Sequence, residues 1–103
     1  MNGNLSRQYE NIITSLSTVA LARVEGVVPV SPAKKAGKNR GVQVFIDEHN
    51  MVTINVSVNL YHDKAVSDVA YAIQESIKND VESATIFKVK SVNVNVVGVI
   101  FTR

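Results

Sequence analysis

The fold is decided by two neighbouring stretches, 42–46 (VQVFI) and 52–60 (VTINVSVNL), in which apolar residues occupy alternate positions. Side chains alternate between the two faces of a β-strand, so this period of two predicts two strands that each bury one face. The residues between them, 47–50 (DEHN), have the composition of a turn. The sequence therefore predicts an antiparallel hairpin with one buried face and one polar face.

Two amphipathic helices flank this hairpin. Residues 6–24 and 64–84 each carry apolar side chains at spacings of three and four, which places those side chains along one stripe. Gly26 is well placed to end the first helix in a left-handed conformation. Candidate N-caps are Ser6 for the first helix and Asp63 or Ser67 for the second, where Asp68 also suits the helix dipole.

Two further strands complete the predicted domain. Residues 27–30 form a short apolar strand, and Pro29 indicates an edge position. Residues 87–102 alternate like a strand, with a slip of one residue around Gly98 that indicates a β-bulge. The order α-β-β-β-α-β predicts an α+β two-layer sandwich, with a mainly antiparallel sheet and both helices on one face. Its 103 residues, 1–103, are the size of a single domain.

The composition excludes several classes of site. The chain has no Cys, so disulfides, thiol catalysis and thiolate metal sites are excluded. Its two His residues and scattered carboxylates show no metal-ligand spacing. His62 and Asp63 are the only adjacent His–carboxylate pair, and neighbouring residues on a strand point to opposite faces. We therefore expect a protein that is not an enzyme and holds no cofactor or metal.

The apolar runs are short. None approaches the length needed to span a bilayer, and residues 1–6 lack the basic and then apolar pattern of a signal peptide. We therefore expect a cytoplasmic location.

A basic segment at 33–41 has no apolar periodicity and is predicted to be a flexible loop. It holds four of the eleven basic residues, which could contact a phosphate backbone or an anionic membrane surface. No aromatic residue is interleaved to stack a base, and the net charge is only +2. A solvated loop is therefore favoured over nucleic-acid binding, which stays as the alternative function. The candidate contacts are Lys34, Lys35, Lys38 and Arg40.

The predicted outer face of the two long strands carries no charge. A freely solvated sheet face usually carries Lys and Glu, which keep strands from associating. This face therefore predicts an interface for self-association or for a protein partner, whereas pairing of Thr and Asn across strands within one monomer explains the same residues. Both interpretations stay open. The candidate interface residues are Thr53, Asn55, Ser57, Asn59, Ser91, Asn93 and Asn95, with Tyr61 and Val96 as further outward positions.

Four local motifs occur in order along the chain: a Val-x-Gly-Val junction at 24–27, a hairpin at 41–44 and 52–58, a helix with an apolar-Gln-Glu-x-apolar core at 69–77, and a closing strand, VNVNVVGV, at 92–99. Together they resemble the motifs of the alkaline shock protein family of Gram-positive envelope-stress proteins. This sequence departs from the family pattern in its basic segment.

The resemblance implies a non-enzymatic structural or scaffolding protein of the cell-envelope stress response. Such a protein would act through protein–protein contacts and self-assembly near the membrane. The implied partners are a membrane anchor protein, a kinase-like enzyme or further copies of the chain. The resemblance supplies no catalytic residues.

Overall fold

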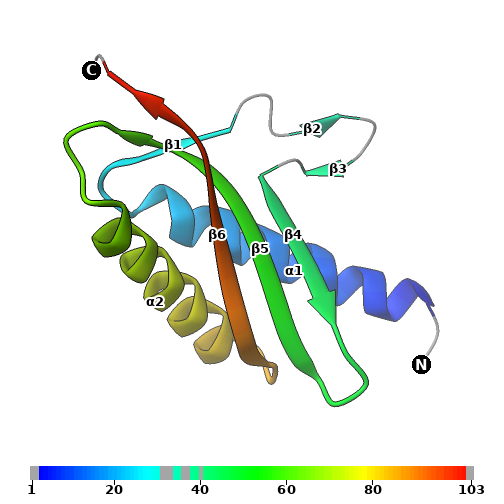
Figure 1. Ribbon diagram of the computed structural model, residues 1–103. Helices are drawn as coiled ribbons and strands as arrows, with labels where there is room; N and C mark the ends of the chain where they lie inside the picture. The colour runs from blue at the N-terminus through cyan, green and yellow to red at the C-terminus, as the bar shows by residue number, and fades with distance from the viewer. Residues whose placement is uncertain (1–2, 31–33, 36–37, 40, 102–103) are drawn as a thin grey trace.

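The computed structural model describes residues 3–30, 34–35, 38–39 and 41–101. A twisted sheet packs one face against two helices; in Figure 1 the first helix passes behind the sheet and the second lies to its left. The predicted α+β two-layer fold and its α-β-β-β-α-β order are confirmed, with one small hairpin added. The elements are α1 (Gly3–Ala22), β1 (Val27–Pro29), β2 (Lys34–Lys35), β3 (Lys38–Asn39), β4 (Val42–Ile46), β5 (Met51–Tyr61), α2 (Val66–Ala84) and β6 (Lys88–Ile100).

Strand β5 is the centre of the sheet. Strand β6 pairs with it in parallel along its whole length, because α2 carries the chain back to the same end before β6 begins. The opposite edge of β5 is shared by two antiparallel strands: β4 pairs with residues 52–56 and β1 with residues 58–60. β1 and β4 therefore follow one another along the same edge, which confirms the edge position predicted for the short strand. The sheet is mainly antiparallel, as predicted, with one parallel pairing.

The hydrophobic core lies between β5 and the two helices. On β5, alternate residues from Val52 to Leu60 are buried, as the period of two predicts. Helix α2 faces them with apolar residues at four-residue spacing, and α1 contributes a second stripe. The most deeply buried members are Ile13, Ala20, Val52, Ile54, Val56, Val58, Leu60, Ile73, Ile77 and Val81.

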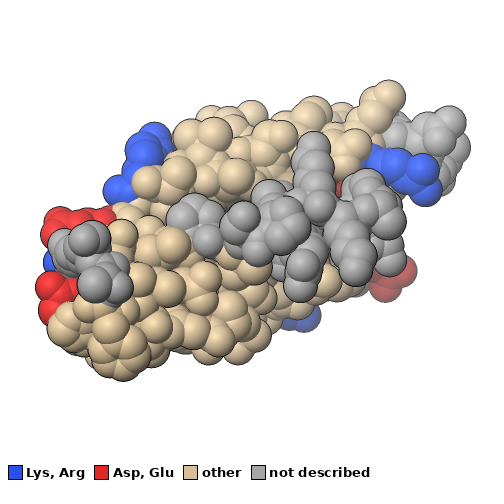
Figure 2. Space-filling view, turned by 90° about the horizontal axis from the view of Figure 1, so that it is seen from above, with Lys and Arg blue, Asp and Glu red and all other residues tan. Residues whose placement is uncertain are grey.

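The core between the sheet and the helices is apolar. Apart from Ser17, the buried residues in the described part of the chain are hydrophobic, so none of them carries a charge. In the view from above, the Lys, Arg, Asp and Glu side chains that are coloured lie mostly towards the two ends of the molecule (Figure 2).

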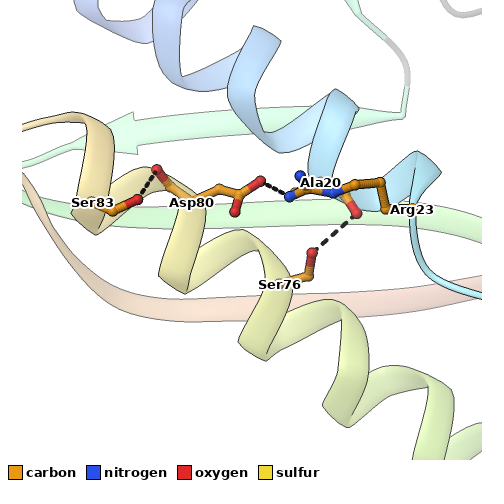
Figure 3. Close-up of polar contacts among 5 residues, drawn as sticks. All are labelled: Ala20, Arg23, Ser76, Asp80 and Ser83. Atoms are coloured by element: carbon orange, nitrogen blue, oxygen red, sulfur yellow. Dashed lines mark hydrogen bonds and ion pairs between the residues drawn. The ribbon is translucent and has the colours of Figure 1, made fainter.

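Polar contacts join the C-terminal part of α1 to α2 (Figure 3). Arg23 forms an ion pair with Asp80, and Ser76 Oγ donates a hydrogen bond to the Ala20 carbonyl at 3.1 Å. Ser83 Oγ donates to the carbonyl oxygen of Asp80 at 3.3 Å. Because the Arg23 side chain is largely exposed, the ion pair contributes only about 0–1 kcal/mol, and apolar packing dominates the contact between the helices.

The helix ends differ in part from the sequence-based expectations. Gly26 has φ of 93°, which confirms its predicted left-handed conformation after α1. The predicted caps are wrong: α1 begins at Gly3, so Ser6 lies inside the helix, and α2 has Ala65 at its N-cap. Within the described chain Ala65 makes no side-chain cap bond, so tertiary packing outweighs capping at this end.

The register of β6 shifts twice. The shift at Val97 confirms the predicted bulge. A second shift, at Lys90, was missed, although the spacing of three between Val89 and Val92 is its signal in the sequence. Beside the bulge at Val97, a Cβ on Gly98 would lie 2.5 Å from Asn59 Oδ1, so glycine leaves the space that the Asn59 side chain occupies.

The β4–β5 turn is organised by one carboxylate. Asp47 Oδ1 accepts hydrogen bonds from the backbone N–H groups of His49 at 2.8 Å and Met51 at 3.0 Å. These bonds, chiefly the one from Met51, hold the pKa of Asp47 below its ordinary value. Asn50 completes the turn with φ of 60°, a conformation that Asn tolerates.

Shortening a buried side chain of α2 should destabilise the fold. We expect Ile77→Ala to lower the free energy of unfolding by about 3 kcal/mol, because Ile77 is fully buried and the site cannot collapse completely. Val66→Ala, at an exposed position of the same helix, should cost less than about 1 kcal/mol. Chemical denaturation of both variants measures the difference, and equal costs would contradict this view of the core.

The turn should make stability pH-dependent in one direction. The folded pKa of Asp47 lies below its unfolded value, so its stabilisation is present above the unfolded pKa and is lost as the pH falls through the folded pKa. Asp47→Asn keeps an acceptor oxygen without the charge, and it should flatten the decline in stability below about pH 4. Thermal denaturation over a pH series measures this, with Glu48→Gln in the same turn as the control. An unchanged profile for Asp47→Asn would refute it.

Candidate interaction surface

One face of the sheet is left uncovered by the helices, and it faces the viewer in Figure 1. Because side chains alternate along a strand, the residues between the buried positions of β5 and β6 point to this side. They include every candidate interface residue predicted from the sequence. We call this set the open face: Thr53, Asn55, Ser57, Asn59, Ser91, Asn93 and Asn95.

The register of β5 and β6 brings the members of the open face into two adjacent rows. Thr53 lies beside Ser91, Asn55 beside Asn93 and Ser57 beside Asn95. The β5 row is half-buried although no helix covers it, because it has strands on both sides. The rows therefore form a continuous surface of small polar side chains.

Part of the open face is held by a contact within the monomer. Asn93 Nδ2 donates a hydrogen bond to Asn55 Oδ1 at 2.8 Å, so pairing across strands within one monomer is observed at this position. An asparagine amide has two donor hydrogens and an acceptor oxygen, so each residue keeps capacity for further bonds. Pairing within the monomer and docking of a partner are therefore compatible here.

Two β4 residues on this side were missed as candidates. Gln43 lies opposite Asn55 and Phe45 opposite Thr53, and both are exposed. The signal was present in the sequence, since both residues alternate with the buried positions of 42–46.

The predicted extent of the face needs two corrections. Val96 is half-buried against the core and does not point outward, because the bulge comes one residue later, at Val97. At the other end of β6, exposed Lys88 and Lys90 border the open face, so its uncharged stretch begins at Ser91.

The basic segment is only partly described. Strands β2 and β3 pair antiparallel, with Lys34 opposite Asn39 and Lys35 opposite Lys38, so the prediction of a loop without secondary structure is wrong there. The physical reason is local: backbone groups of a chain that turns back on itself pair with each other. The structure describes only the backbone of Lys34, Lys35 and Lys38, and Arg40 lies outside the described residues.

The two histidines are exposed and lie apart from the open face. His62 stacks on Phe101, with 5.4 Å between ring centroids. His49 Nε2 lies 3.6 Å from Glu48 Oε1 in the β4–β5 turn. Over the described ranges, no three His, Cys, Asp or Glu side chains gather as a metal site would require. No helix in the described part of the chain is long and apolar enough to cross a membrane.

Comparison with known proteins identifies a family. The model of the alkaline shock protein 23 family, described as having a cell envelope-related function, matches residues 5–101. The resemblance predicted from the four sequence motifs is therefore confirmed. No curated protein matches the chain.

Solved structures show the same fold at low identity. One MamM CTD chain is 16% identical, with a TM-score of 0.51 over 85% of this chain and 96% of that chain. A MamM CTD variant is 18% identical, with a TM-score of 0.50 over 93% of this chain and 98% of that chain. At such identities the likeness concerns the fold alone.

The amide contact on the open face should be measurable as a coupling energy. We expect a double-mutant cycle with Asn55→Ala and Asn93→Ala to give a coupling of about 0.5 kcal/mol, because the pair is a cross-strand contact at the surface. Denaturant unfolding of the four proteins measures it. Fully additive effects would show that the two side chains do not bond in solution.

Proposed function

Because the chain belongs to the alkaline shock protein 23 family, whose function is cell envelope-related, we propose that it is a non-enzymatic scaffolding protein of the cell-envelope stress response. It acts through protein–protein contacts, and the open face is the surface that binds the partner. The observation that carries this proposal is the uncharged, helix-free side of the sheet.

The chemistry of the open face suits a protein interface. Removing a charged side chain from water costs far more than removing an amide or hydroxyl that finds a new hydrogen bond. The centres of protein interfaces are accordingly depleted in charged residues. From Thr53 to Tyr61 and from Ser91 to Asn95 the chain has no charged residue, so a partner could cover both rows at low cost.

The open face also has rigidity and an apolar anchor. Strand β5 is hydrogen-bonded on both edges, and the Asn93–Asn55 bond fixes two side chains before any partner binds. Little conformational entropy is therefore lost on binding. Exposed Phe45, beside Thr53, provides an aromatic side chain of the kind enriched in binding hot spots.

Two observations support the non-enzymatic part of the proposal. His62 and Asp63 are exposed beside each other in the turn that follows β5, away from the open face. The carboxylate with a lowered pKa, Asp47, uses its oxygen to hold the β4–β5 turn, which is a structural task.

The proposal places the protein at the envelope through a partner. A membrane anchor protein that presents an uncharged surface is the partner that the open face would accept, and a kinase-like enzyme is the second candidate. The net charge of +2 gives only weak attraction to anionic lipids, so specific contacts must supply the affinity.

The open face should be the site that captures the partner. We expect Asn55→Glu with Asn93→Glu to abolish co-purification of the protein with the envelope fraction, because two buried carboxylates would face a partner surface without countercharges. Asn11→Glu with Asn79→Glu makes the same change at exposed helix positions and should have no effect. Fractionation and immunoblotting measure both.

A photo-crosslinking residue at Asn93 or Asn79 identifies what touches each surface. Adducts with an envelope protein from Asn93, and none from Asn79, are the expected result. Adducts from Asn79 alone would overturn the proposal, and nuclease-sensitive adducts would favour nucleic-acid binding by the basic segment.

A further inference from the structure

One edge of the sheet has no neighbouring strand in the part of the chain that the structure describes. Among the described strands, β6 pairs with β5 alone, which leaves the other side of this 13-residue strand as a free edge. A free edge presents unpaired N–H and C=O groups and is a template for pairing with another chain. Which of these groups are already bonded decides where pairing can occur.

The direction of the backbone groups follows from the two ends of β6. The Lys88 N–H donates to the Asn50 carbonyl at 3.4 Å, and the Ile100 carbonyl accepts from the His62 N–H at 3.0 Å, so both groups point towards β5. In a parallel pair, successive residues direct their groups alternately to the two edges. We follow this alternation from Lys88 to Ile100 and allow for the extra residue at each bulge. The residues whose backbone N–H and C=O groups then point to the free edge are Val89, Val92, Val94, Val96 and Val99.

Helix α2 covers the first half of this edge. Gln74 Nε2 donates to the Val92 carbonyl at 3.0 Å, and Glu82 Oε2 accepts from the Val89 N–H at 2.8 Å. These bonds agree with the directions obtained from the ends of the strand. They also block a second strand from pairing at these residues.

The helix does not reach the second half. Gln74 contacts Val92, and α2 begins eight residues before Gln74, at Val66. Because a helix rises ~1.5 Å per residue and a strand ~3.3 Å, these eight helical residues are as long as about four strand residues. The start of α2 therefore lies level with about Val96. The segment beyond, residues 97–101, extends past the helix. We call it the β6 tip.

The β6 tip is apolar and exposed. The side chains of Val97, Val99 and Phe101 are 54%, 47% and 75% exposed. The segment from Ser91 to Phe101 contains no charged residue, although Lys and Pro are the usual means of protecting an edge. Two such tips can therefore approach each other without electrostatic repulsion.

We propose that the β6 tip pairs antiparallel with the tip of a second copy, about a two-fold axis at Val99. In that register the two Val99 residues exchange both N–H···O=C bonds, because both direct their backbone groups to the free edge. Val97 and Phe101 lie two residues before and after Val99. Val97 of each copy therefore faces Phe101 of the other copy. Such aromatic and β-branched cross-strand pairs stabilise sheets.

The same geometry explains why the occupant is a second copy. A two-fold axis at Val99 pairs each apolar residue of one tip with an apolar residue of the other. Because α2 begins level with about Val96, neither copy's helix would lie between the paired residues. This inference rests on the proposed scaffolding function and names one of its partners. It uses an edge that is separate from the open face.

Proline at Val99 tests the pairing directly. Val99→Pro removes an N–H that faces the free edge and takes no part in the β5 ladder, and proline is tolerated at such positions. Val99→Ala trims the side chain and keeps the N–H, so it is the matched control. In sedimentation velocity over a concentration series, we expect the unmodified chain and Val99→Ala to dimerise, and Val99→Pro to weaken the dimer about tenfold or more.

A charged pair of variants covers the case in which Val99→Pro fails to fold, which circular dichroism reveals. Val97→Lys should then abolish dimerisation, because it places a charged side chain against Phe101 of the partner copy, whereas Ile86→Lys, at a 79% exposed position outside the strand, should not. A strictly monomeric unmodified chain, or dimers unaffected by both tip variants, would overturn the inference. Envelope capture through Asn55 and Asn93 is measured separately, so either proposal can fail while the other stands.

Discussion

The alternation of side chains along β5 is the constraint on which the rest of the structure depends. Its inward residues, from Val52 to Leu60, receive the apolar stripes of both helices, and its outward residues form one row of the open face. A register slip of one residue would exchange the two sets, exposing the core and burying Asn and Ser. The core and the candidate binding surface are therefore fixed by the same pattern.

Helix α2 has two roles that follow from its place in the sequence, after β5 and before β6. As a crossover it makes β6 parallel to β5, and it packs Ile73 and Ile77 into the core. Its polar residues Gln74 and Glu82 bond the backbone of β6 at the free edge. Because the helix rises less per residue than the strand, it covers only part of that edge, and the remainder is the apolar tip.

The two proposed surfaces suit different partners. The open face is polar and uncharged, and a chain with complementary amide and hydroxyl groups would match it. The β6 tip offers backbone hydrogen bonds and three apolar side chains, and an identical tip satisfies both. From Thr53 to Tyr61 and from Ser91 to Phe101 the chain has no charged residue, so both surfaces can be covered without burying an unpaired ion. Together they would let one small domain bind an envelope partner while it associates with its own copies.

The sequence by itself determined the features that depend on local periodicity. The hairpin of β4 and β5, the two helices, Gly26 as a helix terminator, the bulge near Gly98 and the membership of the open face all follow from spacings of two, three or four residues. The tertiary structure alone decided features that depend on contacts between distant segments. These are the placement of β1 and β4 along one edge of β5, the inward turn of Val96, and the covering of the β6 edge by α2. The pairing of β2 with β3 is local but lacks any apolar alternation. The physical reason for the division is that periodicity reports which face of a strand or helix is buried, whereas edges, neighbours and coverage are set by how those faces pack together.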